Sequence, residues 1–533
     1  MRYKLVIVAM LLIQTVWAVR AKTFYHAYTQ SDGTALTLTL AGDEHFHWYQ
    51  DREGICYELL QDGQDFRRLP AASLNAGLKQ AARTRTRTRN VGDYRTQWDA
   101  NRTYRQAVIL VAYNDQDFGM DDPHGYYDNL FNKRGLSYRS VSGCVAEYLR
   151  DQSRGMCNIV FDVYGPVRIA RSAKSSGTNY GSASFRMATQ KAIDSLHVDF
   201  APYDWDGDRE VEQVIFVSAG YCANGGSSKT TGYVWPNTSV FSTVTTDGGL
   251  RISEYSASAE KWFNDIPCGI GTILHEFSHN LGLPDLYPTN VGSYSVVDEW
   301  DLMDGGNYTD WGWCPPNYSV MEKMLLGWLT PEEISQPVSI IDMKPLQDGG
   351  QAYRISMTDS QYYLLENRQQ HGWDAGLPGR GLLITRVDYD GIAWANNRVN
   401  DNGVYHYDIV RADGMSYDDW DEYVKASGLP AYADSEHNMN RLHLSTAAFP
   451  LISDTREVRS CELSSWAVTD VGMTEDGLVS FEVTMATAIG SPSLQGAVDD
   501  DEGKPWYDLQ GRRLQGQPAR KGLYIRNHKK YLR

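Results

Sequence analysis

The segment from His275 to Asp285 constrains this chain more than any other, because it reads H-E-x-x-H-x-x-G-x-x-D. Side chains at positions i and i+4 of a helix lie one turn apart on the same face. His275 and His279 can therefore direct two imidazoles at one metal ion, and Zn²⁺ is the ion that such pairs usually bind. The spacing predicts a helix over about 271–281 that carries a zinc site.

Three further residues of this segment suit a catalytic zinc site. Glu276 follows the first histidine, so its carboxylate can act as general base on a metal-bound water. Gly282 allows the chain to leave the helix through a positive φ, after which Asp285 can supply an oxygen ligand. Three protein ligands and one water form the open coordination that distinguishes catalytic zinc from structural zinc.

Two neighbouring features argue against a chance occurrence of the motif on a polar helix. Apolar residues repeat at i+4 spacing beside the histidines and predict a core-facing stripe. They are Ile273, Phe277 and Leu281. Met303 lies in a short turn, as does the methionine found beneath the zinc of metzincin peptidases. Asp301 and Asp304 flank Met303 and are alternatives to Asp285 as the third ligand.

The N-terminal residues 1–21 read as a secretory signal peptide. Arg2 and Lys4 precede a short apolar run, and Ala18 and Ala21 offer cleavage sites. The apolar run is shorter than the roughly 20 residues of a membrane-spanning helix, and no later segment is long and apolar enough to span a bilayer. We therefore expect export, with no transmembrane segment after signal cleavage.

The seven cysteines are scattered and form no C-x-x-C pair, which argues against a cysteine zinc site. Export permits disulfides, but their pairing cannot be read from the sequence. Cys56 lies in the expected pro-segment. Its thiolate could bind the catalytic zinc and hold a precursor inactive, although a structural role is the ordinary alternative.

The formal net charge of −17 argues against nucleic-acid binding, which needs a basic face. Part of the acidic charge is concentrated at Asp204, Asp206, Asp208 and Glu212, around a glycine suited to a sharp turn. Calcium loops need this density of carboxylates, although the glycine position departs from the EF-hand pattern. The segment predicts a Ca²⁺ site, with a solvated acidic turn as the alternative.

Residues 22–104 are expected to form a pro-segment and a basic linker. Residues 22–70 alternate apolar and polar positions, notably at Leu36 to Leu40, and predict a small β-rich unit. Residues 71–104 read as a linker. Its basic run from Arg83 to Arg89 is either an activation site for proteolysis or a solvated tether.

Strand and helix patterns alternate through residues 105–330, which predicts an α/β zincin catalytic domain. Its expected strands are 106–113 and 214–217, and its expected helices before the zinc helix are 125–133 and 145–152. Residues 331–486 contain short strands such as 362–365 and 381–385 between turn signals, which predicts a β-sandwich-like domain. Residues 487–533 read as a linker and a C-terminal tail.

Together with the zinc motif, three downstream segments resemble the immune inhibitor A family of secreted bacterial zinc peptidases, which are metzincin-like. They are Tyr318 to Leu329, Leu364 to Arg368 and Leu377 to Gly381. The resemblance implies a zinc endopeptidase made as a precursor. It matches His275 and His279 to the zinc imidazoles, Glu276 to the general base and Asp285 to the third ligand.

The resemblance and the motif predict a secreted zinc-dependent endopeptidase that hydrolyses proteins or peptides. The tail from Tyr507 is similar to C-terminal sorting segments, which implies contact with export or surface-anchoring machinery. The expected location is therefore outside a bacterial cell or on its surface. The alternative is a surface adhesion or binding protein with an inactive zincin domain, but an inactive site would not require Glu276.

Overall fold

The computed structural model describes residues 16–17, 19–22, 24–43, 45–60, 63–84, 98–139, 141–174, 181–290, 295–415, 439–453, 457–486, 506–507, 523–526 and 529–532. The chain divides into two compact units, Met1–Thr484 and Met485–Arg533. In the second unit the described strands β25 (Trp506–Tyr507), β26 (Leu523–Arg526) and β27 (Lys529–Leu532) form an antiparallel sheet.

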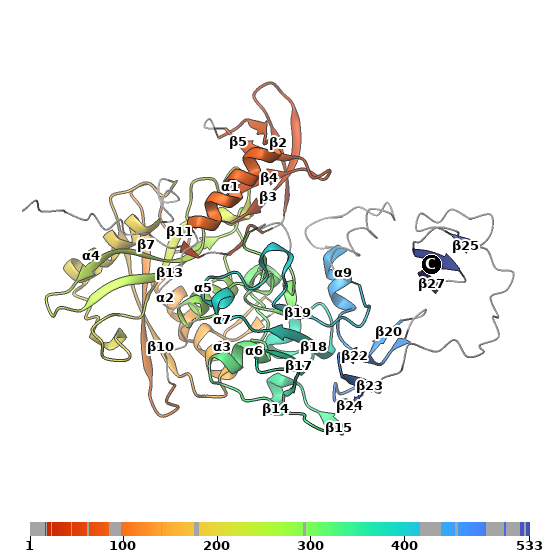
Figure 1. The fold of residues 1–533 in the computed structure, drawn as a ribbon. Coiled ribbons are helices and arrows are strands. Elements are labelled where there is room, and N and C mark those ends of the chain that lie inside the picture. The colour runs from red at the N-terminus through yellow and green to blue at the C-terminus, as the bar shows by residue number, and fades with distance from the viewer. Residues whose placement is uncertain are drawn as a thin grey trace, which may run out of the picture. The chain divides into compact units, whose positions relative to one another are not determined.

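A six-stranded mixed sheet contains strands drawn from residues 16–261 (Figure 1). In spatial order its strands are β1 (Val16–Trp17), β12 (Asn237–Thr245), β13 (Arg251–Lys261), β11 (Val214–Tyr221), β7 (Tyr104–Ala112) and β10 (Ile159–Arg168). The four strands from β13 to β10 are parallel, whereas β12 and β1 pair antiparallel at one edge. This edge lies beside the site described below.

Side chains alternate between the two faces of the sheet, as the period of two in a strand requires. Val108 and Leu110 of β7 pack in one core, whereas Ile109 and Val111 pack in another. The first core contains side chains of α2 (Pro123–Asn132), α3 (Val145–Gln152) and α5 (Ile270–Asn280). The second contains side chains of α4 (Ser182–Leu196). The sheet is therefore covered on both faces, which explains the continuous apolar run in β7.

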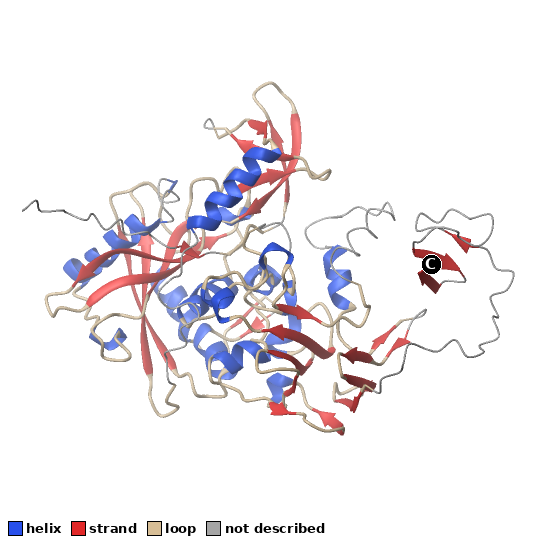
Figure 2. Cartoon of the chain, viewed as in Figure 1, coloured by secondary structure: helices blue, strands red, loops and turns tan. Residues whose placement is uncertain are grey.

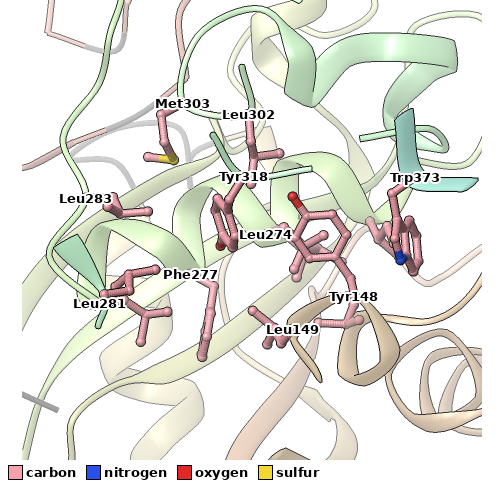
Figure 3. Packing of buried hydrophobic residues seen from close by; sticks show 14 of the residues in the cluster. Tyr148, Leu149, Leu274, Phe277, Leu281, Leu283, Leu302, Met303, Tyr318 and Trp373 are labelled. Carbon is pink, nitrogen blue, oxygen red and sulfur yellow. The ribbon is translucent and has the colours of Figure 1, made fainter. Parts of the chain in front are cut away.

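Helix α5 is buried along its whole length. Its apolar stripe of Ile273, Phe277 and Leu281 joins the first core, as the i+4 spacing predicts. Figure 3 shows Phe277 and Leu281 on the side of α5 that faces Leu149, with Met303 beyond the helix on the other side. The buried apolar stripe sets the rotation of α5 about its own axis. It therefore also fixes the direction in which the polar side chains of α5 point.

Two further sheets lie later in the chain and share one apolar core. The first contains β14 (Glu332–Glu333), β16 (Tyr353–Ser356), β17 (Gln361–Arg368), β18 (Gly381–Asp388) and β19 (Tyr407–Ile409). The second contains β15 (Val338–Met343), β24 (Val479–Met485), β23 (Trp466–Met473) and β22 (Cys461–Leu463). Leu365 and Ile384 from the first sheet pack with Val468 and Phe481 from the second. Figure 2 shows how strands dominate this part of the chain.

Shorter elements connect these layers. They are the helices α6 (Val320–Leu325), α7 (Gly391–Ala395) and α9 (Met439–Ser445), the 3₁₀ helices η4 (Asp298–Trp300) and η5 (Gly306–Gly312), and the two-stranded pairs β8 (Ser137–Tyr138) with β9 (Val141–Ser142) and β20 (Leu451–Ile452) with β21 (Glu457–Val458). Within the described residues, no helix has the length and hydropathy needed to cross a membrane.

The N-terminal region contains a five-stranded antiparallel sheet and one helix. Its strands are β2 (Tyr25–Thr29), β3 (Ala35–Gly42), β4 (His47–Gln50), β5 (Cys56–Leu59) and β6 (Phe66–Arg68). Helix α1 (Ala71–Thr84) replaces the first part of the expected linker, because this stretch is rich in alanine and leucine, which are strong helix formers. A side chain at Gly77 would overlap the ring of Phe46, so α1 packs closely on the sheet. The basic run from Arg85 onward lies outside the described residues.

Candidate active site

Helix α5 places His275, Glu276 and His279 in the interior, where each is fully buried. The two imidazole rings lie 4.8 Å apart between centroids, as expected for positions separated by one helical turn. Helix α5 also packs closely on η5. A Cβ atom at Gly271 would lie 2.2 Å from the Asn307 carbonyl oxygen, so this contact requires glycine.

The chain turns back immediately after α5 and brings a carboxylate to the histidines. Gly282 has φ 108°, a conformation that glycine adopts readily and other residues rarely do. Asp285 Oδ1 then lies 3.1 Å from His275 Nε2 and 3.4 Å from His279 Nε2. One ligand atom of each residue lies within 4.8 Å of the others, which is the arrangement a metal ion needs.

Hydrogen bonds to the main chain fix the tautomer of both imidazoles. His275 Nδ1 donates to Leu302 O at 2.9 Å, and His279 Nδ1 donates to Leu283 O at 2.8 Å. Each Nε2 therefore keeps a lone pair directed at the shared point beside Asp285. Such Nδ1–H contacts to a carbonyl are the usual support of metal-binding histidines. Two imidazoles and a carboxylate are a donor set that suits zinc.

The electrostatics of the cluster also favour a cation at this point. Burial by itself would raise the pKa of Asp285, but the two histidines hold that pKa below its ordinary range. Burial lowers the pKa of His279, but Asp285 outweighs it and raises that pKa to about 8. The buried carboxylate thus favours positive charge on its neighbours, and a bound metal ion would provide that charge in place of a proton.

Asn397 holds the Asp285 carboxylate in position and was not identified from the sequence. Its Nδ2 donates to Asp285 Oδ2, and its Oδ1 accepts from the Asp285 backbone N–H. Asn397 lies 112 residues further along the chain, after α7, and no local pattern marks it. An asparagine at a positive φ of 53° was the one signal that a special role existed, and it is visible only in the structure.

The turn around Met303 supports the cluster from one side. Met303 is fully buried, and Leu302 beside it supplies the carbonyl that binds His275. Asp304 Oδ2 accepts backbone N–H groups of residues 296–298, and Asp301 Oδ1 accepts the Met303 N–H at 2.9 Å. Asp285 is therefore grouped with the two histidines, whereas Asp301 and Asp304 stabilise the turn.

Glu276 lies beside the cluster and faces the edge of the sheet. Its Oε2 accepts from Thr238 Oγ1 at 3.0 Å, and Thr238 belongs to β12. Burial raises the pKa of Glu276 to about 7, although the two histidines act in the opposite direction. A carboxylate with a pKa near neutrality can both accept and return a proton, as a general base must.

The N-terminal segment reaches this glutamate, which the sequence did not predict. The Val19 N–H donates to Glu276 Oε1 at 3.0 Å, and Trp235 Nε1 donates to Val19 O at 2.7 Å. Val19 is fully buried, and Ala21 is 3% exposed. Both residues belong to the stretch 1–21 that reads as a signal peptide. Cys56, by contrast, is half-buried on β5 and does not belong to the metal-binding group.

The acidic turn forms a second cluster at the surface. Ligand atoms of Asp204, Asp206 and Asp208 lie within 4.8 Å of one another, although Asp206 and Asp208 are exposed. Glu212 is not part of this group, because both of its oxygens accept the Trp205 backbone N–H at 2.8 Å. The structure thus brings together three of the four predicted calcium ligands.

Comparison with known proteins agrees with this geometry. Residues 96–324 match the family described as immune inhibitor A peptidase M6, catalytic domain. The chain is also 23% identical over 289 residues to the pre-pro-metalloprotease PrtV of Vibrio cholerae serotype O1, in strains M66-2 and ATCC 39315 (El Tor Inaba N16961). That similarity covers 46% of this chain but 30% of each relative, so the chain matches less than a third of their length. Residues 96–324 are therefore a metallopeptidase domain of the immune inhibitor A peptidase M6 family.

Proposed function

We propose that this chain is a secreted zinc-dependent endopeptidase that hydrolyses protein or peptide substrates. The observation that carries the proposal is the convergence of His275, His279 and Asp285 on one point, with the Glu276 carboxylate beside it. In this proposal the three residues bind zinc and Glu276 is the general base. The family of the catalytic domain and the metalloprotease PrtV support the same reaction class.

In this proposal each residue of the site has a separate role in hydrolysis. Bound zinc supplies the positive charge that acidifies a water molecule and polarises the scissile carbonyl. Glu276 takes a proton from the attacking water and passes it to the leaving amide nitrogen. Thr238 holds Oε2 of Glu276, which keeps Oε1 directed toward the substrate side of the site. Asn397 and the Leu302 carbonyl fix the ligands, so that little reorganisation accompanies the reaction.

We further propose that the chain is made as a precursor. The contact between Val19 and Glu276 supports latency, because a segment bound there excludes substrate. In this proposal residues 22–104 form the pro-segment and linker, 105–330 the catalytic domain and 331–486 a β-sandwich-like domain, and residues 487–533 engage export or anchoring machinery at a bacterial surface.

Calcium binding at Asp204, Asp206 and Asp208 is part of the same proposal. The three carboxylates offer oxygen ligands at a turn where Gly207 adopts a φ of 81°. Hard oxygen ligands of this density suit Ca²⁺.

The test is digestion of casein by the purified secreted protein, combined with metal analysis. We expect one zinc per chain, loss of digestion with a zinc chelator, and recovery when zinc is returned. Asp285→Ala should lose most of its zinc, whereas Asp301→Ala and Asp304→Ala should retain theirs. A secreted protein that contains zinc but does not digest casein or other unfolded proteins would contradict the proposed function.

A further inference from the structure

The N-terminal segment lies in the site in the manner of a bound peptide. Strand β1 pairs antiparallel with β12, the strand that would otherwise form this edge of the sheet. Val16 is opposite Ser239, and Trp17 is opposite Thr238. Pairing of an extended peptide with an exposed strand edge is a general mode of peptide recognition. The same edge is therefore available to a protein substrate once this segment has left.

The position of Val19 fixes the register of the bound segment. A general base must deliver its proton to the leaving amide nitrogen, so the amide nearest to Glu276 marks the scissile bond. That amide is the Val19 N–H, 3.0 Å from Glu276 Oε1. The Val19 nitrogen thus takes the place of the leaving amide nitrogen. Val19 then corresponds to the first residue after the scissile bond, and Arg20 to the second.

Hydrogen bonds to two carbonyls hold the segment on this C-terminal side. Trp235 Nε1 donates to Val19 O at 2.7 Å, and Tyr308 Oη donates to Arg20 O. Asn224 Nδ2 in turn donates to Tyr308 Oη at 3.0 Å, which orients the phenol. These groups bind the main chain and place no requirement on the side chain at either position.

The Arg20 side chain, by contrast, is recognised by its charge. Its Nη2 lies 3.5 Å from Asp298 Oδ1, and each side chain is 12% exposed. Burial raises the pKa of Asp298 to about 7, whereas Arg20 acts to lower it. A carboxylate in this environment gains more from a cationic partner than an exposed one does, because little water screens the pair.

The fold holds Asp298 in this place by specific contacts. Asp298 adopts a φ of 46°, and its backbone N–H donates to Asp304 Oδ2 at 3.0 Å. A Cβ atom at Gly305 would lie 2.0 Å from Asp298 Oδ1, so the glycine leaves room for the carboxylate. The neighbouring Glu299 is paired with Arg441.

We propose that Asp298 forms a specificity pocket for a basic side chain at the second residue after the scissile bond. The enzyme then prefers proteins with arginine at that position, and with lysine as the second choice because its ammonium group lacks the planar, pre-organised donor geometry of a guanidinium. This inference rests on the proposed peptidase function and names its substrate class.

The test uses an internally quenched peptide with residues 16–22, Val-Trp-Ala-Val-Arg-Ala-Lys, and the same peptide with glutamine or glutamate in place of arginine. The enzyme is the secreted protein in its casein-digesting form. We expect cleavage between alanine and the second valine, located by mass spectrometry. We expect kcat/KM for the arginine peptide to exceed that for the glutamine peptide by about tenfold or more, and the glutamate peptide to be cleaved most slowly.

Asp298→Asn should reduce the arginine-to-glutamine ratio to about one, because a neutral amide no longer attracts the guanidinium by charge. Glu299→Gln is the matched control, because it removes a neighbouring carboxylate and should retain the ratio. Equal cleavage of the three peptides by the wild-type enzyme, or cleavage at another bond, would overturn the inference while casein digestion preserves the proposed function. A zinc-loaded protein that digests neither casein nor peptide contradicts both.

Discussion

At the scale of single residues, the sequence predicted the proposed metal ligands but not the residues that contact them. His275, Glu276 and His279 are separated by fixed helical spacing, so the motif alone brings them together. Asp285 reaches the two histidines through the short turn at Gly282, which is also local in the sequence. Asn397 and Val19 reach the same site from distant parts of the chain. Such contacts depend on tertiary folding, and no local pattern of residue types encodes them.

Asn397→Ala should weaken zinc binding although Asn397 does not itself bind zinc. Without its two hydrogen bonds, the Asp285 carboxylate loses its fixed orientation, and loss of such a supporting contact typically lowers metal affinity by about 10- to 100-fold. Competition with a chelator of known affinity measures the effect. Asn402→Ala is the control, because the exposed Asn402 bonds only with the Asn290 side chain among the contacts described, and its loss should leave zinc affinity unchanged. Equal affinities in the two variants would show that Asn397 does not position the ligand.

Glu212 makes the stability of the protein depend on pH. Burial, followed by the charges of Asp206 and Asp204, raises its pKa from 4.5 to about 8. Between these pH values the folded chain holds a proton on Glu212 that the unfolded chain releases. The contribution of protonated Glu212 to folding stability is therefore complete below about pH 4.5 and is lost as the pH rises through 8. In chelator, Glu212→Gln should therefore be more stable than the wild type at pH 9, by about 1–2 kcal/mol, and equally stable at pH 4. Unfolding curves measure the stability of both proteins at each pH. The assignment would be refuted if the difference in unfolding free energy between Glu212→Gln and the wild type were the same at pH 4 and pH 9.

At the scale of elements, periodicity predicted the buried helices and strands well. Helix α3 has the predicted bounds, and α5 begins one residue earlier than expected. Strand β7 begins two residues earlier and ends one residue earlier than expected. Helix α1 was missed because the basic run after it suggested a linker, although alanine and leucine favour a helix. Strand β1 was missed for a different reason: its residues are apolar enough to serve as a signal sequence, and only pairing with β12 gives them a place in the fold.

The close contact between α5 and η5 should be sensitive to a single methyl group. Gly271→Ala places a Cβ atom against the backbone carbonyl of Asn307, which cannot move as a flexible side chain would. We expect a loss of about 1–3 kcal/mol in unfolding free energy, because overpacking of a rigid contact has this effect. Gly472→Ala in β23 is the control, since a Cβ atom there meets no atom within 4 Å. Thermal denaturation of the two variants checks the prediction, and equal melting temperatures would refute it.

At the scale of the first compact unit, a buried ionic network joins β17 of the first downstream sheet to the chain around Asn317, which precedes β14. Arg368 on β17 is fully buried and binds Asp374 through Nε at 2.8 Å and Nη2 at 2.7 Å. Its Nη2 also donates to Asn317 O at 3.2 Å, and Asp374 Oδ1 accepts the Asn317 N–H at 2.9 Å. The sequence marked Arg368 through a family resemblance, but its role follows from contacts that only the fold brings together.

Asp374→Ala should therefore destabilise the unit by about 3 kcal/mol or more, because it leaves a buried guanidinium with reduced compensation. Denaturant unfolding followed by tryptophan fluorescence measures the change. Glu58→Ala removes the partner of Arg67 from an exposed pair and should cost less than about 1 kcal/mol. If both substitutions had the same small effect, Arg368 would not be a structural link between the two regions.

The role of Glu276 is the central claim, and one measurement tests it most directly. Zinc content and casein turnover should be determined on the same preparation of Glu276→Ala and of the wild-type secreted protein. The proposal predicts one zinc per chain in both proteins, because both imidazoles and Asp285 remain, and a fall in turnover of about 100- to 10,000-fold in the variant. A zinc-loaded variant that digests casein at a rate near that of the wild type would contradict it.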